Sequence, residues 1–168
     1  MPDKTVEHVW DLMEQVRFCM LATWNGTHLH ARPMGAFVRR DENAIYFLAD
    51  ARRPKEAEIG ACPQVCVAFA DTHGQKYVSV SGTAEVSADR RKIRQLWSIP
   101  ARIWWDTPED PNIRLITIVP ENAEYWDSPG NVVSNIKMAV ALATGAHPYP
   151  GKHEKLAEER LRTAARGG

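Results

Sequence analysis

Short apolar segments separated by turn signals occupy most of the chain. Residues 18–24 (FCMLATW) are apolar on both faces, which is typical of a strand that is covered from both sides. Asn25-Gly26 then supplies a strong hairpin turn signal. Later segments alternate with the period of two that a strand requires. The pattern predicts strands at residues 18–24, 27–38, 44–49, 64–70, 75–87 and 113–119.

Other segments carry helix signals. Apolar residues recur at spacings of three and four between residues 5 and 16, which predicts an amphipathic helix. A short helix is predicted at 54–59 and another at 88–97, where Ser87 can cap the first turn. A further helix is predicted at 130–144.

Six strands with hairpin signals and short helices between them favour a mainly β, α+β protein. We expect a closed six-stranded antiparallel barrel with peripheral helices. The length suits one domain, which we place at residues 1–150. Residues 151–168 are charged and are interpreted as a C-terminal helix or tail.

Composition narrows the range of partners. Lys and Arg number 21 and Asp and Glu also number 21, so no overall charge draws the chain to nucleic acid or to an anionic membrane. The 44% hydrophobic and 25% charged content is that of a globular protein. No apolar run reaches the ~20 residues of a membrane-spanning helix, and the first residues lack a signal-peptide core. We therefore expect a cytoplasmic protein.

No metal site is predicted. Cys19, Cys62 and Cys66 have neither a disulfide framework nor the spacing of a zinc site, and small buried thiols are the favoured interpretation. His28 and His30 lie two apart on one strand face, but no further ligands accompany them.

The strongest candidate for chemistry lies between the second strand and the second helix. Pro33 interrupts a strand pattern, where it cannot donate to the ladder, and Gly35 lets a backbone or a ligand approach closely. Pro54 suits a first helical position, but Arg53 before it is a poor cap, so the first N–H groups stay free. Free N–H groups beside Arg52, Arg53 and Lys55 favour an anion, and we expect a phosphate.

These residues lie in motifs that resemble the flavin-binding split barrels related to pyridoxamine 5′-phosphate oxidase, and most closely the general stress protein 26-like branch. The family's strand bearing Arg-Pro-Met is matched by Arg32-Pro33-Met34. Its aromatic-led segment and the following Ser/Arg-x-Lys-x-x-Glu-Ile are matched by Phe47-Leu48-Ala49 and residues 53–59 (RPKEAEI). The resemblance covers residues 18–126 and extends to the segments 81–85 (SGTAE) and 123–126 (AEYW).

The resemblance implies an FMN-binding split barrel that forms a homodimer with the flavin at the subunit interface. In the relatives the Lys and Arg of these motifs bind the FMN phosphate, and Arg53 stands where many of them have serine. The backbone of Met34 and of Phe47-Leu48 would contact the ring system, and aromatic side chains would cover it. The implied cofactor-binding residues are Arg32, Pro33, Met34, Phe47, Leu48, Arg53, Lys55, Tyr77, Trp105 and Trp126.

The implied function is an FMN-dependent oxidoreductase of unknown substrate with a stress-related role. A non-catalytic flavin-binding stress protein, a store or sensor, is the alternative, and a deazaflavin is a weaker alternative cofactor. True pyridoxamine 5′-phosphate oxidases follow the aromatic-Trp segment with Arg-x-His, and residues 127–135 (DSPGNVVSN) contain neither, so that reaction is not expected. No residue identifies itself as a general acid or base, and the catalytic residues stay unassigned.

Overall fold

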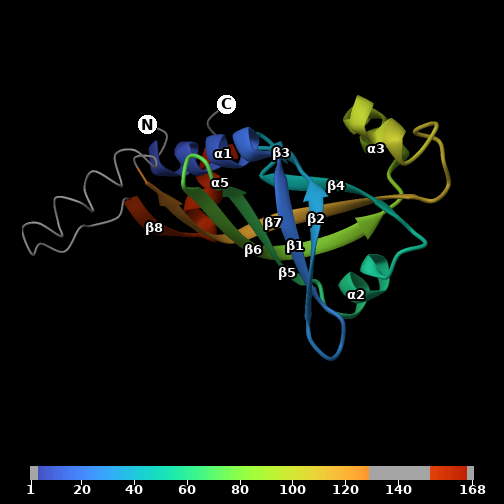
Figure 1. The fold of residues 1–168 in the computed structure, drawn as a ribbon, viewed down its shortest axis with the longest axis horizontal. Helices are drawn as coiled ribbons and strands as arrows, with labels where there is room; N and C mark the ends of the chain where they lie inside the picture. Colours follow the sequence, from blue (N-terminus) through green and yellow to red (C-terminus); the bar gives the residue numbers. More distant parts are fainter. Residues whose placement is uncertain (1–3, 129–151, 166–168) are drawn as a thin grey trace, which may run out of the picture.

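The computed structural model describes residues 4–128 and 152–165, so the helix predicted at 130–144 lies outside the described residues. Figure 1 shows one curled sheet with helices on its outside. The strands are β1 (Phe18–Trp24), β2 (Leu29–Gly35), β3 (Phe37–Arg39), β4 (Ala44–Asp50), β5 (Gln64–Asp71), β6 (Lys76–Ser87), β7 (Ile113–Asp127) and β8 (Lys152–Ala157). The helices are α1 (Lys4–Val16), α2 (Lys55–Ala61), α3 (Arg90–Leu96), the 3-10 helix η1 (Ile99–Ile103) and α5 (Glu158–Ala165).

The order of the strands explains the curl. Neighbouring strands are antiparallel and follow the order β2-β1-β5-β6-β7-β4-β3, with β8 added beside β7. Ala36 alone joins β2 to β3, which stand at opposite ends of that order, so the sheet must bend until its ends meet. The predicted antiparallel split barrel with peripheral helices is confirmed, although the described sheet has eight strands instead of six.

Two apolar cores hold the sheet. The larger core fills the inside of the curl, where alternate residues of the strands meet the apolar side of α1, as the period-two pattern requires. The smaller core lies on the other side of β4 and β7 under α3 and η1. The buried residues of the smaller core are Ala44, Tyr46, Ile93, Leu96, Ala101, Trp105, Ile113 and Leu115.

The last predicted strand, 113–119, is too short. We expected Pro120 to end it, but β7 is 15 residues long and runs from Ile113 to Asp127. The register between β6 and β7 shifts between Ser81 and Gly82, and Pro120 lies opposite Gly82 at this bulge. A bulge tolerates a residue without an N–H group, so the proline kinks the pairing without stopping it.

Part of the expected charged tail is built into the fold. Residues 152–157 form β8, which pairs with β7, and only the residues from Glu158 onward are helical. Leu156 and Leu161 are both fully buried in the larger core. These two leucines anchor the charged segment against the larger core, because each removes a large apolar surface from water.

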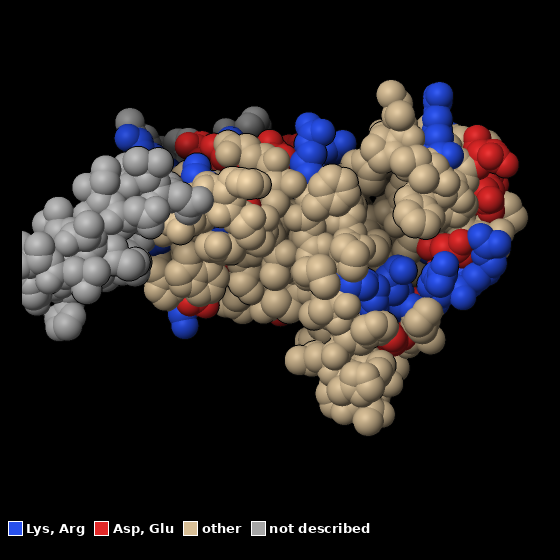
Figure 2. Space-filling model, viewed as in Figure 1, with Lys and Arg blue, Asp and Glu red and all other residues tan. Residues whose placement is uncertain are grey.

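One face of the sheet remains uncovered by any described element. Its exposed apolar residues include Phe18, Met20, Trp24, Leu29, Tyr77 and Trp126. Figure 2 shows few charged side chains over this area, with Lys and Arg gathered toward the end that carries α2. We call it the open sheet face.

Candidate functional site

Three basic residues meet where β2 passes the start of α2. Arg32 comes from β2, Arg53 precedes α2, and Lys55 is its first residue. Lys55 is half-buried, and burial lowers the pKa of its ammonium group, with the charges of Arg32 and Arg53 lowering it further. The structure therefore brings together the three cations that the sequence predicts.

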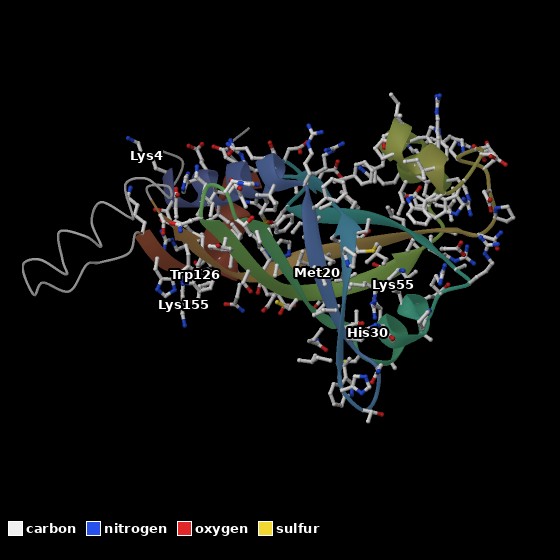
Figure 3. All side chains as sticks on the ribbon, viewed as in Figure 1. Lys4, Met20, His30, Lys55, Trp126 and Lys155 are labelled. Atoms are coloured by element: carbon white, nitrogen blue, oxygen red, sulfur yellow. The ribbon has the colours of Figure 1, made fainter. Side chains whose placement is uncertain are left out.

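Lys55 and Arg53 have charges that no neighbour takes up. In residues 4–128 and 152–165, no ion pair or side-chain hydrogen bond involves the ammonium group of Lys55 or the guanidinium group of Arg53. A half-buried cation without a counter-ion is unfavourable, and a bound anion would relieve it. Figure 3 shows Lys55 in the right-hand half of the molecule, close to His30.

Arg52, although adjacent, is engaged elsewhere. It contacts the Asp50 carboxylate through its backbone N–H at 2.9 Å, through Nε at 2.9 Å and through Nη2 at 2.5 Å. These bonds lower the pKa of Asp50 to about 2. Arg52 is therefore a partner of Asp50 and not part of the anion site.

Arg32 is already paired with a buried carboxylate. Its Nη2 lies 2.5 Å from Oε2 of Glu58, and its Nη1 donates to Oγ1 of Thr23 at 2.9 Å. Thr23 in turn donates to the same Glu58 oxygen at 2.5 Å. The side chains of Arg32 and Glu58 are 13% and 9% exposed, and Thr23 is fully buried. The triad is therefore largely shielded from water.

Glu58 is ionised at neutral pH. Burial alone raises the pKa of its carboxyl group, but the hydrogen bonds from Thr23 and Arg32 and the charge of Arg32 outweigh burial, so the pKa lies below its ordinary value. Sequence reasoning assigned no role to Glu58 or Thr23. The available signals were a glutamate three residues after Lys55, and a threonine within an apolar strand.

The local backbone also fits a ligand. Pro54 occupies the cap position of α2 with φ −67° and ψ −11°, and no side chain caps the helix. On the other side of the cluster, β3 pairs with β4 only at residues 44–46. The edge of β4 at Phe47 and Leu48 therefore has backbone groups without a strand partner on that side.

The side chains of the predicted ring-contacting residues point in different directions. Phe47 is fully buried in the larger core, and Leu48 packs against the smaller one, so only their backbone can meet a ligand. Met34 packs partly against the larger core, and its carbonyl accepts from the Cys19 thiol at 3.5 Å. Pro33 is exposed on the open sheet face.

The predicted aromatic residues do not join the basic cluster within one chain. Tyr77 and Trp126 lie opposite each other on β6 and β7. Trp126 stacks on His153, with ring centroids 5.0 Å apart and an interplanar angle of 7°. Figure 3 shows Trp126 toward the opposite end of the molecule from Lys55.

The adjacent tryptophans separate into one buried and one exposed ring. Trp105 is 8% exposed and packs in the smaller core, whereas Trp104 is 72% exposed. Trp104 therefore has the ring that is free to cover a ligand or a partner, although the sequence prediction selected Trp105. The buried Nε1 of Trp105 has no hydrogen-bond partner within the described part of the chain.

Among the described residues, no group of three or more His, Cys, Asp or Glu side chains has a metal-binding arrangement. No described helix is long and apolar enough to cross a membrane.

The curled antiparallel sheet is that of a split barrel, and comparison with known proteins gives its family. The chain belongs to the pyridoxamine 5′-phosphate oxidase-like family, which matches residues 4–149. It is 28% identical to general stress protein 26 of Bacillus subtilis over 125 residues, which are 73% of this chain and 88% of the relative.

Solved structures agree with this assignment. A general stress protein 26 from Jannaschia sp. CCS1 superposes with a TM-score of 0.75 and 26% identity, covering 92% of this chain and 99% of the other. The general stress FMN/FAD binding protein from Xanthomonas citri gives a TM-score of 0.66 and 26% identity, covering 74% of this chain and 90% of the other. The expected relationship to the general stress protein 26 branch is confirmed.

Proposed function

We propose that this protein binds FMN and acts as an FMN-dependent oxidoreductase with a stress-related role in the cytoplasm. The observation that carries the proposal is the half-buried Lys55, which meets Arg53 and Arg32 without a counter-ion of its own in the described residues. A phosphate monoester carries about −1.5 to −2 charges at neutral pH and would neutralise such a cluster. The binding of flavin by the Xanthomonas citri relative supports the same assignment.

The residues present fit FMN. Lys55 and Arg53 would contact the phosphate directly, and Arg32, which is paired with Glu58, would lie behind them. The unpaired backbone edge at Phe47 and Leu48, together with the backbone of Met34, would hydrogen-bond the flavin ring. Pro33 would form part of the wall beside it.

We further propose that a second copy of this chain completes the site. Trp126, with Tyr77 opposite it on β6, lies toward the other side of the molecule from Lys55 (Figure 3), so neither ring is placed to cover a flavin whose phosphate is held by Lys55 of the same chain. They lie on the open sheet face, and a contiguous exposed apolar face is typical of a protein–protein interface. In a twofold homodimer they would cover the flavin bound by the partner. The exposed Trp104 is a further candidate for that cover.

Bound FMN would supply hydride and single-electron transfer chemistry. The protein's contribution would then be to hold the phosphate, orient the ring and limit the access of water. A second candidate function is flavin binding without turnover. It is favoured by the similarity to the Xanthomonas citri relative, which is a general stress FMN/FAD binding protein.

The first test is binding. We expect the purified protein to be yellow or to bind added FMN, and the variant K55A to weaken binding by about 1–3 kcal/mol through loss of a charge-assisted hydrogen bond. The matched control is K155A, because Lys155 is an exposed lysine on β8. Fluorescence titration measures both variants. Equal FMN affinity in wild type and K55A would contradict the placement of the phosphate.

The second test separates the two candidate functions. The FMN-loaded protein is mixed anaerobically with NADH or NADPH, and the flavin absorption is followed before and after oxygen is admitted. Reduction followed by reoxidation is expected of an oxidoreductase. A protein that binds FMN and is reduced by neither donor is assigned to the second candidate function.

A further inference from the structure

Glu58 is a buried negative charge at the centre of a site that is otherwise positive. The inference drawn from it rests on the proposed phosphate site. Glu58 belongs to the same short helix as Lys55, three residues further on, and its Oε2 contacts both Arg32 and Thr23. Its Oε1 lies 3.6 Å from Nδ1 of His30. A carboxylate is unusual among groups that must attract a phosphate, because like charges repel.

The hydrogen bonds show how far Arg32 is committed. Its Nη2 donates to Glu58 and also to Nδ1 of His30 at 2.8 Å. A guanidinium group has no acceptor, so the imidazole nitrogen must be the acceptor here. Its Nη1 donates to Thr23, so three of its five N–H donors are engaged.

Glu58 also reduces the positive charge with which the site could attract a phosphate. The positive charge of Arg32 is balanced by Glu58 at 2.5 Å, so an incoming phosphate meets a neutral pair together with Lys55 and Arg53. Both members of the pair are mostly buried, and their charges are therefore weakly screened by solvent. The carboxylate opposes the bound phosphate even while it holds Arg32 in place.

We propose that Glu58 is a positioning residue that fixes Arg32 and limits how tightly the site holds a phosphate monoester. Glu58 acts as a built-in counter-anion: it keeps the cluster stable when no ligand is bound, and it makes the phosphate exchangeable. A purely structural role makes the opposite prediction, because removing a structural contact would loosen the site and weaken binding.

The deciding variant is E58Q. Glutamine has the same shape and keeps an oxygen that can accept from Thr23 and Arg32, but it carries no charge. We expect E58Q to bind FMN about tenfold more tightly, the effect of one unit charge acting over a few ångströms in a partly buried site. Its affinity for riboflavin, which has no phosphate, should stay at the wild-type value.

The matched control is E56Q. Glu56 lies on the same helix, but it is exposed and pairs with Arg114 at 3.4 Å. The change in formal charge is the same as in E58Q, whereas solvent screening is much stronger. We expect less than about a twofold change in FMN affinity for E56Q at 0.15 M salt, and none at 0.5 M, while the effect of E58Q persists.

E58D provides a second variant that keeps the charge and a compact buried side chain. It withdraws the carboxylate by one methylene, so a smaller increase, about two- to threefold, is expected. FMN affinity in E58Q and E58D that is equal to or below that of the wild type, in folded protein by circular dichroism, overturns the proposal. A wild type that binds FMN no better than riboflavin removes the phosphate site itself, which is a separate failure.

Discussion

Arg52 and Arg53 are neighbours in the chain, yet only Arg52 has its charge matched. Asp50 lies two residues before Arg52 and contacts it through three hydrogen bonds. Those bonds lower the pKa of Asp50 to about 2, so the pair stays ionised at any physiological pH. Asp50 thus engages one arginine and leaves the other free for a ligand. The same division holds for Arg32, which is paired, and Lys55, which is not.

Acid is expected to destabilise the fold through Glu58. The pKa of its carboxyl group is lower in the folded protein than its ordinary value of about 4.5, so the unfolded chain takes up a proton first as the pH falls. The contribution of Glu58 to the free energy of unfolding is complete above about pH 4.5, and it is lost as the pH falls through the lower folded-state value. Urea unfolding of wild type and E58Q between pH 7 and 3 measures it. E58Q should show the shallower decline, and identical slopes would contradict this assignment.

At the scale of elements, the pairing of β6 with β7 depends on one small residue. A Cβ atom added to Gly82 would lie 2.3 Å from the carbonyl oxygen of Val119, and real Cβ contacts are never this short. The glycine is needed at this bulge because the neighbouring backbone occupies the space of a side chain. The longest strand pairing in the sheet therefore tolerates Pro120 only with Gly82 opposite.

G82A is expected to lower the free energy of unfolding by about 1–3 kcal/mol, the usual cost of overpacking a closed site. The control is G60A, because a Cβ at Gly60 meets nothing within 4 Å and Gly60 lies inside α2, where alanine is the better helix former by up to about 1 kcal/mol. Chemical denaturation compares the two variants. A G82A protein as stable as G60A would show that the backbone at the bulge moves aside readily.

The sequence predicted the strands correctly where the local alternation of apolar and polar residues determines their bounds. The segment 18–24 agrees with β1 in both bounds, and the strands predicted at 44–49, 64–70 and 75–87 match β4, β5 and β6 within one residue. The single strand predicted at 27–38 is wrong, because the chain forms two strands there, β2 and β3, which separate at Ala36. The pattern failed where the bounds of a strand depend on the strand that it pairs with. The charged segment of β8 pairs with β7 and is anchored by the buried Leu156. Pro120 is tolerated within β7 because it lies at the bulge opposite Gly82 of β6.

The same limit applies to the site. Arg53 and Lys55 were predicted because a basic, uncapped helix start is a local feature. Thr23 and Glu58 were missed because their contact spans 35 residues and depends on how α2 docks against β1. The choice between Trp104 and Trp105 likewise depends on which ring faces the smaller core, and adjacent residues in a sequence do not reveal that.

At the scale of the whole molecule, the open sheet face and the separated halves of the site point to the same arrangement. Lys55 lies toward one side of the molecule, and Trp126, with Tyr77 opposite it on β6, lies toward the other (Figure 3). A twofold axis through the face would bring one set of residues against the other set of the partner, and it would create two equivalent sites. The open face and the divided site would then have one explanation.

M20E is expected to separate such a dimer. Met20 lies on β1 between the two ends of the open sheet face, so a charge there would be buried without a partner. Light scattering should show wild-type dimers and M20E monomers at micromolar concentration, and M20E should lose FMN affinity. I103E is the control, because Ile103 is equally apolar and more exposed, but belongs to η1. A monomeric wild type, or a dimeric M20E, would exclude this interface.

Mixing variants tests whether each site draws on two chains. K55A and W126A should each bind FMN poorly alone. After mixing in equal amounts and exchange of subunits, half of the dimers are mixed, and each mixed dimer has one intact site, so about a quarter of all sites should recover wild-type affinity. Titration with FMN measures this fraction. No recovery after confirmed subunit exchange would place both residues in the same chain's site or outside it.

The position of Pro33 has a consequence for how the protein behaves at high concentration. β2 is a terminal strand of the sheet, and a proline in its middle deprives an incoming strand of a donor where it would need one. Growth by adding strand to strand, the route to fibrils, is therefore blocked along that margin. The proposed twofold contact through the open sheet face would, in contrast, end at two copies, because it uses the same surface of both chains.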